Sequence, residues 1–178
     1  MTRIPSGRPG DGEYASYAKA DIDLVAGDDA VEALAAQVEE LVALFAPIDE
    51  RTASTLVYAP GKWTLKQVVG HLADDERIFA HRALSVARGD PAPLPGFNEK
   101  EYVRLAGFEA RSWEDLLAEA RVVRESSLAL FRPFTPEVWR RRGTVNGYEA
   151  SARGLAFHIA GHELHHLRIV REKYLGRP

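Results

Sequence analysis

Apolar residues recur every three or four positions in four long stretches of the chain, the spacing that places them on one face of an α-helix. A proline or glycine follows each stretch and ends it. Each stretch also begins at a residue that can cap a helix, namely Asp28 or Asp29, Thr64 with Gln67, Ser112 with Asp115, and Ser151. The pattern therefore predicts helices over residues 29–46, 65–88, 113–131 and 152–175.

The segments between these stretches carry turn-forming residues. Residues 1–12 are rich in Gly, Pro and Arg and are expected to form a loose arm. Several prolines make residues 90–107 a loop, with a short helix expected at 98–105. Asn146-Gly147 predicts a tight reversal, but alternating strand patterns are otherwise nearly absent. The sequence therefore predicts an all-α fold, a four-helix bundle.

Composition narrows the classes of function. The 178 residues carry 23 basic and 26 acidic side chains, a net charge of −3, which argues against a protein that binds nucleic acid. The absence of cysteine excludes disulfides, thiolate metal sites and cysteine nucleophiles. No apolar stretch reaches the roughly 18 residues that cross a bilayer, and no signal-peptide core is found at the N-terminus. We expect one cytoplasmic domain, residues 1–178, that binds neither nucleic acid nor membranes.

Histidines supply the candidate chemistry. Four of the six lie close together in the last predicted helix: His158, His162, His165 and His166. Two imidazoles four positions apart on a helix point at a common spot and can bind one metal ion. The pairs 158/162 and 162/166 both have this spacing, so spacing leaves the choice open. His71, among apolar neighbours in the second long helix, is the natural third ligand. We predict one divalent ion, with zinc or nickel favoured and iron as a further candidate.

Two carboxylates follow His71 by about one turn. Asp74 and Asp75 can each orient a ligand imidazole by accepting a hydrogen bond from it. The alternative for both is a solvated acidic face of the helix. His81, near the end of the same helix, is expected to be exposed.

Residues 162–166 match the H-E-x-x-H pattern of zinc proteases, in which Glu163 would be the general base. Glu163 is therefore the candidate catalytic residue. The context for a protease is poor, because Ile169 stands where the extended motif requires glycine. Glu163 also lies about 100° around the helix from His162, so pairing with Arg77 or Arg168 is the alternative.

Three stretches of the chain carry a further pattern: Gly61-Lys62-Trp63-Thr64 running into Gly70-His71-Leu72-Ala73-Asp74-Asp75-Glu76-Arg77, then Leu94-Pro95-Gly96-Phe97, and Ala160-Gly161-His162-Glu163-Leu164-His165-His166-Leu167. These stretches resemble the DinB-like (DinB/YfiT-like) family of metalloenzymes. Their order and spacing agree with the family from about residue 13 to residue 175.

This resemblance implies a four-helix bundle of the DinB/YfiT-like type in which His71, His162 and His166 bind one divalent ion. It leaves His158 and His165 as neighbours of the ion rather than ligands. It also implies a homodimer and a small-molecule substrate. Some relatives are S-transferases or an isomerase that use a low-molecular-weight thiol, and others are described only as metal-dependent hydrolases.

We therefore expect a metal-dependent enzyme, a thiol-dependent S-transferase or a hydrolase, in which the ion activates a water or a thiol. The loop at 90–107 is expected to line a substrate pocket, with Trp63, Phe97 and Tyr102 as candidate walls; plain core packing is the alternative for each. Two non-catalytic alternatives remain. One is a stress-response bundle that binds a metal or small ligand without turnover. The other is a structural ion, whose site would be closed by a fourth ligand such as His158 or Asp75.

Overall fold

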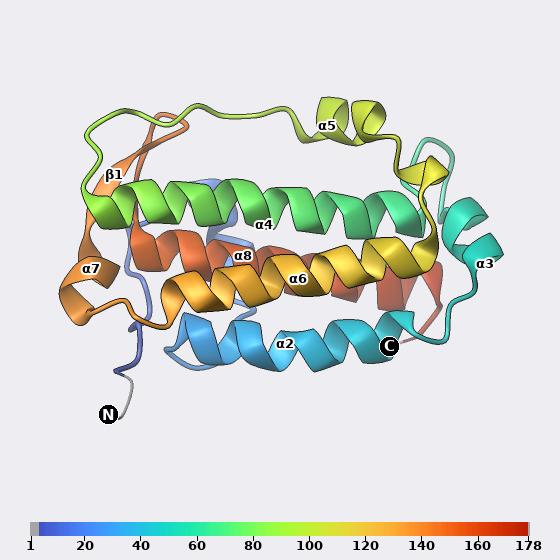
Figure 1. The fold of residues 1–178 in the computed structure, drawn as a ribbon, viewed down its shortest axis with the longest axis horizontal. Helices are drawn as coiled ribbons and strands as arrows, with labels where there is room; N and C mark the ends of the chain where they lie inside the picture. Colours follow the sequence, from blue (N-terminus) through green and yellow to red (C-terminus); the bar gives the residue numbers. More distant parts are fainter. Residues whose placement is uncertain (1–3, 178) are drawn as a thin grey trace.

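Four long helices run side by side in the computed structural model, which describes residues 4–177 (Figure 1). Both α2 and α4 pack against α6 and against α8. The four helices are α2 (Ala30–Phe45), α4 (Leu65–Arg88), α6 (Trp113–Phe131) and α8 (Ala152–Ile169). The predicted four-helix bundle is confirmed, and the first three predicted ranges agree with the structure to within one residue at each end.

The predicted caps begin these helices. Thr64 and Gln67 form a reciprocal capping box at the start of α4. The other three helices are capped by the side chains of Asp29, Ser112 and Ser151, each of which accepts a hydrogen bond from a backbone N–H of the first turn.

The last helix departs from the prediction. A regular helix was expected to residue 175, but α8 ends at Ile169 and the chain continues as a π-helix, η3 (Val170–Tyr174). The wider turn buries both Val170 and Tyr174, and the Tyr174 hydroxyl donates a hydrogen bond of 2.6 Å to the carbonyl of Trp63. Turns of this kind often lie at functional sites.

Shorter elements connect the bundle helices. The expected short helix and the expected hairpin are both present, and Asn146 (φ 51°) and Gly147 (φ 80°) form its tight turn. Four elements were not predicted, namely η1, α1, α3 and η2, because six residues or fewer cannot show a helical stripe. The short elements are η1 (Ser16–Ala18), α1 (Lys19–Ile22), α3 (Glu50–Thr55), α5 (Glu99–Ala106), η2 (Phe108–Ala110), α7 (Pro136–Arg140), β1 (Arg142–Val145) and β2 (Tyr148–Ser151).

The expected loose arm at residues 1–12 is anchored over its described part, residues 4–12. The Arg8 guanidinium donates hydrogen bonds to the carbonyls of Ile22, Val25 and Gly27, over 2.7 to 3.0 Å. Composition gave no sign of this anchoring, because the acceptors are backbone carbonyls. Residues 1–3 lie outside the described part of the chain.

The N-terminal segment crosses α8 closely at two glycines. A Cβ atom at Gly154 would lie 2.0 Å from the carbonyl oxygen of Glu13, and one at Gly161 would lie 2.3 Å from that of Asp21. Only glycine permits such an approach without moving the backbone. The crossing brings α1 beside the part of α8 that carries the histidines.

The loop that follows α4 crosses above that helix toward α5 (Figure 1). Two backbone hydrogen bonds attach it to the hairpin, from Leu94 N–H to the Thr144 carbonyl (2.9 Å) and from Asn146 N–H to the Leu94 carbonyl (2.8 Å). The hairpin thus fixes the position of the loop and of α5.

A layer of buried charge crosses the bundle halfway along its helices. The guanidinium of Arg124, in α6, binds Glu76 of α4 (Nε–Oε1, 2.9 Å) and Glu163 of α8 (Nη2–Oε2, 2.7 Å). It also donates to the Leu34 carbonyl of α2 over 2.9 Å. The three charged residues are at most 5% exposed. All four bundle helices therefore meet at one guanidinium. We call the side chains of Arg124, Glu76 and Glu163 the ionic layer.

The ionic layer separates two apolar clusters. Residues about one turn to one side of it belong to the first cluster, and those about one turn to the other side belong to the second. The first includes Phe79, Leu128 and Ala160, and the second includes Leu72, Ala120 and Leu167. A helix that slipped by one turn would bury an unpaired charge among apolar side chains, so the layer opposes slipped registers.

Replacing Arg124 tests the layer. Arg124→Met leaves two buried carboxylates without a cation, so we expect the free energy of unfolding to fall by about 3–5 kcal/mol in urea titrations followed by circular dichroism. The triple variant E76L/R124M/E163L should recover most of that loss, because no charge remains unpaired. Arg121→Met, at an exposed position of α6, is the matched control and should change stability by less than about 0.5 kcal/mol. If Arg124→Met lowers the free energy of unfolding no more than Arg121→Met does, Arg124 does not hold the ionic layer together.

Candidate metal centre

Three imidazoles from two helices converge inside the bundle. The Nε2 atom of His162 lies 3.3 Å from Nε2 of His71 and 3.2 Å from Nε2 of His166. The ligand atoms of all three histidines lie within 4.8 Å of one another. His71 comes from α4, and the other two come from adjacent turns of α8. The structure thus brings together the three residues predicted as metal ligands.

These distances fit a metal ion. Two nitrogen ligands 2.0–2.1 Å from a tetrahedral zinc ion are about 3.3–3.4 Å apart. Without an ion the arrangement is unfavourable, because the single lone pair of Nε2 in His162 can accept a hydrogen bond from only one of its two neighbours. A cation between the three rings would satisfy all three nitrogens.

Burial keeps the three rings neutral. It lowers the pKa of His71 to about 4 and the pKa of His166 to about 3. The pKa of His162 falls well below its usual range, first through burial and then through the charges of four neighbouring histidines, His166, His158, His71 and His165. Metal ions bind only unprotonated imidazole, so the rings are in the form that an ion requires.

Asp75 lies behind His162 and is 4% exposed. Its Oδ2 atom is 3.3 Å from Nδ1 of His162 and 3.7 Å from Nε2 of His158. A carboxylate at Nδ1 favours the tautomer that protonates this atom and leaves Nε2 free for a metal ion. Burial raises the pKa of Asp75 to about 8, and a nearby cation would favour its charged form. Asp75 thus lies where it can orient the ring of His162, and that it does so stays a prediction; a solvated acidic face is wrong for this buried residue.

The other candidates on the two helices lie away from the three nitrogens. Asp74 is partly exposed and lies 3.6 Å from Arg77. His158 stacks on Phe79, with ring centroids 3.8 Å apart. Nδ1 of His165 lies 3.1 Å from a carboxylate oxygen of Asp21. His81 is exposed, as predicted.

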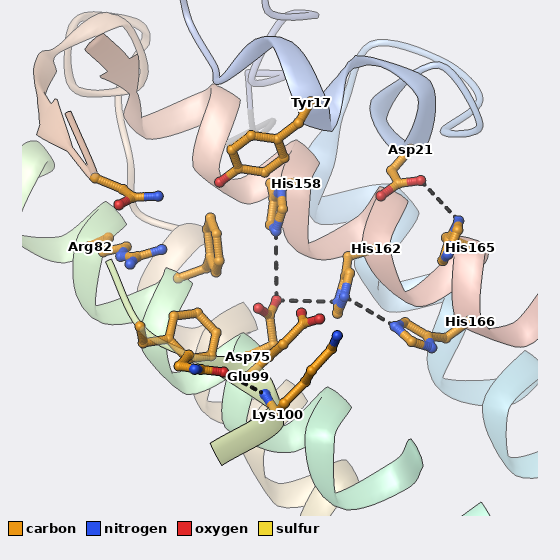
Figure 2. A pocket seen from close by; sticks show the side chains of 14 residues that line it. Tyr17, Asp21, Asp75, Arg82, Glu99, Lys100, His158, His162, His165 and His166 are labelled. Atoms are coloured by element: carbon orange, nitrogen blue, oxygen red, sulfur yellow. Dashed lines mark hydrogen bonds and ion pairs between the residues drawn. The ribbon is translucent and has the colours of Figure 1, made fainter. Parts of the chain in front are cut away.

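A pocket of about 810 Å³ opens beside the histidines (Figure 2). We call it the polar pocket. It lies between α4, α8, the N-terminal segment and the start of α5. Its lining residues are Tyr17, Asp21, Asp75, Phe79, Arg82, Phe97, Asn98, Glu99, Lys100, Asn146, His158, His162, His165 and His166.

Of the three aromatic residues predicted to line a substrate pocket, only one lines the polar pocket. Phe97 lines the polar pocket, as expected. Trp63 lies on the other side of the histidines, its ring centroid 4.8 Å from that of His71 and 6.4 Å from that of His166. Tyr102 does not line the polar pocket; its ring packs edge-on against Phe97 instead, at 5.2 Å.

Comparison with known proteins agrees with this geometry. Residues 33–170 match the DinB superfamily. The chain belongs to the DinB superfamily. The resemblance drawn from the three sequence stretches is thereby confirmed.

The DinB-like fold extends over nearly the whole chain. A similar solved structure is that of YfiT from Bacillus subtilis, with a TM-score of 0.72 and 18% sequence identity over 96% of this chain and 94% of that one. YfiT is described as a probable metal-dependent hydrolase with an unusual four-helix bundle topology. The comparison with curated proteins found no match. None of the helices within residues 4–177 is long and apolar enough to cross a membrane.

Glu163, the candidate base, is not brought to the histidines of this DinB-superfamily chain. Its carboxylate binds Arg124 in the ionic layer and is 4% exposed. The expected pairing with Arg77 or Arg168 is wrong, since Arg77 contacts Asp74 and Glu119. Arg124 is more than thirty residues away along the chain, so helical spacing could not identify it as the partner.

The group of three has no fourth protein ligand among residues 4–177. His158 and Asp75, the two residues expected to close a structural site, are instead in contact with each other or with His162. The side of the group that faces the polar pocket is therefore free of protein ligands in the described part of the chain.

Removing the carboxylate behind His162 tests its role. Asp75→Asn should weaken the affinity for zinc about 10- to 100-fold, because the amide no longer fixes the tautomer of the ligand ring. The measurement is competition with a chromogenic chelator. Asp74→Asn, one position away, is the matched control and should leave the affinity unchanged. Equal affinities for the two variants would show that Asp75 does not act through His162.

Proposed function

We propose that the chain is a metal-dependent enzyme in which His71, His162 and His166 hold one divalent ion. The observation that carries this proposal is the convergence of three neutral imidazole nitrogens at the wall of an open pocket, with no fourth protein ligand among the described residues. Catalytic sites keep an open position of this kind, and structural sites close it. Zinc or nickel suits three imidazoles, and iron is a further candidate.

In this proposal the ion would activate the nucleophile, and the protein would position the ligand rings and the substrate. A divalent ion lowers the pKa of a water or thiol that it binds and so provides a nucleophile near neutral pH. The protein holds the ligand rings: the α4–α8 contact sets their distance, and Asp75 sets the orientation of His162. Phe79 and Phe97 give the polar pocket apolar walls, while Arg82 and Lys100 add positive charge.

The pocket suits a small-molecule substrate, since ligand sites of about 300–1,000 Å³ hold compounds of that class. We propose hydrolysis or thiol-dependent S-transfer as the reaction. A zinc-protease activity is disfavoured, because the carboxylate of Glu163 pairs with Arg124 and does not line the polar pocket, where a general base would have to act. We therefore assign Glu163 to the ionic layer, where it positions the turn of α8 between His162 and His166. The homodimer and the cytoplasmic location stay predictions.

Elemental analysis of the purified, reloaded protein tests the metal site. We expect one divalent ion per chain in the wild type and a loss of at least half of it in His71→Ala, His162→Ala and His166→Ala. His81→Ala, at an exposed position of α4, is the control and should retain the ion. Glu163→Gln should also retain it, with any loss appearing in stability instead. A wild-type chain without a stoichiometric ion would end the proposal.

Activity assays distinguish an enzyme from a protein that binds the ion without turnover. Hydrolysis of nitrophenyl esters and conjugation of a model electrophile with several low-molecular-weight thiols should be measured for the loaded protein, the chelated protein and His162→Ala. We expect one of the two reactions to require both the ion and His162. If a loaded protein is inactive in every reaction of a broad panel, the non-catalytic alternative is favoured.

A further inference from the structure

A second pocket, of about 470 Å³, lies on the other side of His166. We call it the aromatic pocket. It is formed by the loop before α4, the start of α5 and the π-helix η3. Its lining residues are Tyr58, Gly61, Lys62, Trp63, Val68, Glu99, Lys100, His166, Ile169, Val170 and Tyr174.

Three aromatic rings give this pocket flat apolar walls. Tyr58 and Tyr174 pack edge to face, with ring centroids 5.0 Å apart. Trp63 lies nearly parallel to the ring of His166, at an angle of 18°. The hydrogen bond from the Tyr174 hydroxyl to the Trp63 carbonyl holds the two walls together. Flat walls of this kind select planar apolar groups.

Positive charge predominates at the rim. Lys62 and Lys100 both line the aromatic pocket, against one carboxylate, that of Glu99. Within the described residues no ion pair involves either lysine; the Lys62 amine lies over the Tyr58 ring, 5.7 Å from its centroid. Figure 2 shows the Lys100 side chain extending toward His162 and His166. A ligand with a negative group would therefore find unpaired cations at this rim.

The two pockets meet at the candidate metal centre. His166, Glu99 and Lys100 line both of them, so a molecule in the aromatic pocket lies next to the ligand nitrogens without filling the polar pocket. The aromatic pocket has one carboxylate and one imidazole in its wall, whereas three carboxylates and four imidazoles line the polar pocket. This difference indicates that they receive different chemical groups.

We propose that the aromatic pocket binds a planar apolar group that carries a carboxylate, such as an arylalkanoate. The ring lies between Trp63 and the two tyrosines, and the carboxylate reaches Lys62 and Lys100. That this ligand is part of the substrate rests on the proposed function, but its binding does not require the metal ion. The polar pocket then remains free for a polar reactant.

The probe is 4-fluorophenylacetate, observed by fluorine NMR in titrations of the loaded protein. We expect saturable binding that weakens about tenfold in Trp63→Leu, which removes one flat wall. Lys62→Gln and Lys100→Gln should each weaken it about two- to fivefold, as expected for partly exposed charge pairs. A trifluorobutyrate, which has the charge but no ring, should bind more weakly than the aryl compound.

Three controls keep the result interpretable. Asn146→Gly alters only the polar pocket, at a position with positive φ that glycine favours, and should not change binding. Tyr58→Leu removes a second wall from a loop outside the bundle helices, so it gives a further test if Trp63→Leu unfolds. In His162→Ala, binding that still depends on Trp63 supports the pocket even if the metal proposal fails.

Two outcomes would overturn the inference while leaving the metal centre untouched. One is the absence of saturable binding to the wild type. The other is binding that Asn146→Gly weakens and that Trp63→Leu and Tyr58→Leu do not, since the probe would then occupy the polar pocket.

Discussion

One buried guanidinium, at the point where four helices meet, constrains how these helices can be positioned along one another. Arg124 binds carboxylates of α4 and α8 and a carbonyl of α2, so the axial positions of these helices are set relative to α6. The candidate ligands stand close to those carboxylates in sequence: Glu163 lies between His162 and His166, and Glu76 follows His71 by five residues. Convergence of nitrogens to about 3 Å requires a defined register of α4 against α8, and the ionic layer adds to their direct packing a contact that opposes any slip.

The long helices and the clustering of histidines on one face of α8 could be predicted because both depend on local periodicity. Apolar stripes, capping residues and a four-residue histidine spacing all act within one helix, where 100° per residue is known in advance. The family resemblance then separated His162 and His166 from His158, a choice that spacing had left open. The capping box at Thr64 is of the same kind, since both of its partners lie within three residues.

What the sequence did not reveal depends on contacts between distant segments. Glu76 and Arg124 stand on apolar stripes of their helices, each flanked one turn away by buried residues such as Leu72 and Leu128, so the stripe itself could have marked them as buried charges. Their partners could not be identified, because helical geometry does not say which faces meet. The π-helix after Ile169 is also a tertiary effect: its wider turn accommodates the Tyr174 hydroxyl at the Trp63 carbonyl, more than a hundred residues earlier.

Two glycines of α8 determine how far the chain can be shortened without loss of its cavities. By letting the N-terminal segment cross at Gly154 and Gly161, they make Tyr17 and Asp21 part of the polar pocket, although both precede the superfamily match at residues 33–170. Tyr174, on the aromatic side, lies beyond its other end. An expression clone trimmed to the recognised family boundaries would keep all three candidate ligand histidines and yet lose one flank of each cavity. The segments at both ends of the chain therefore shape the two cavities, although the candidate ligands lie within the superfamily match.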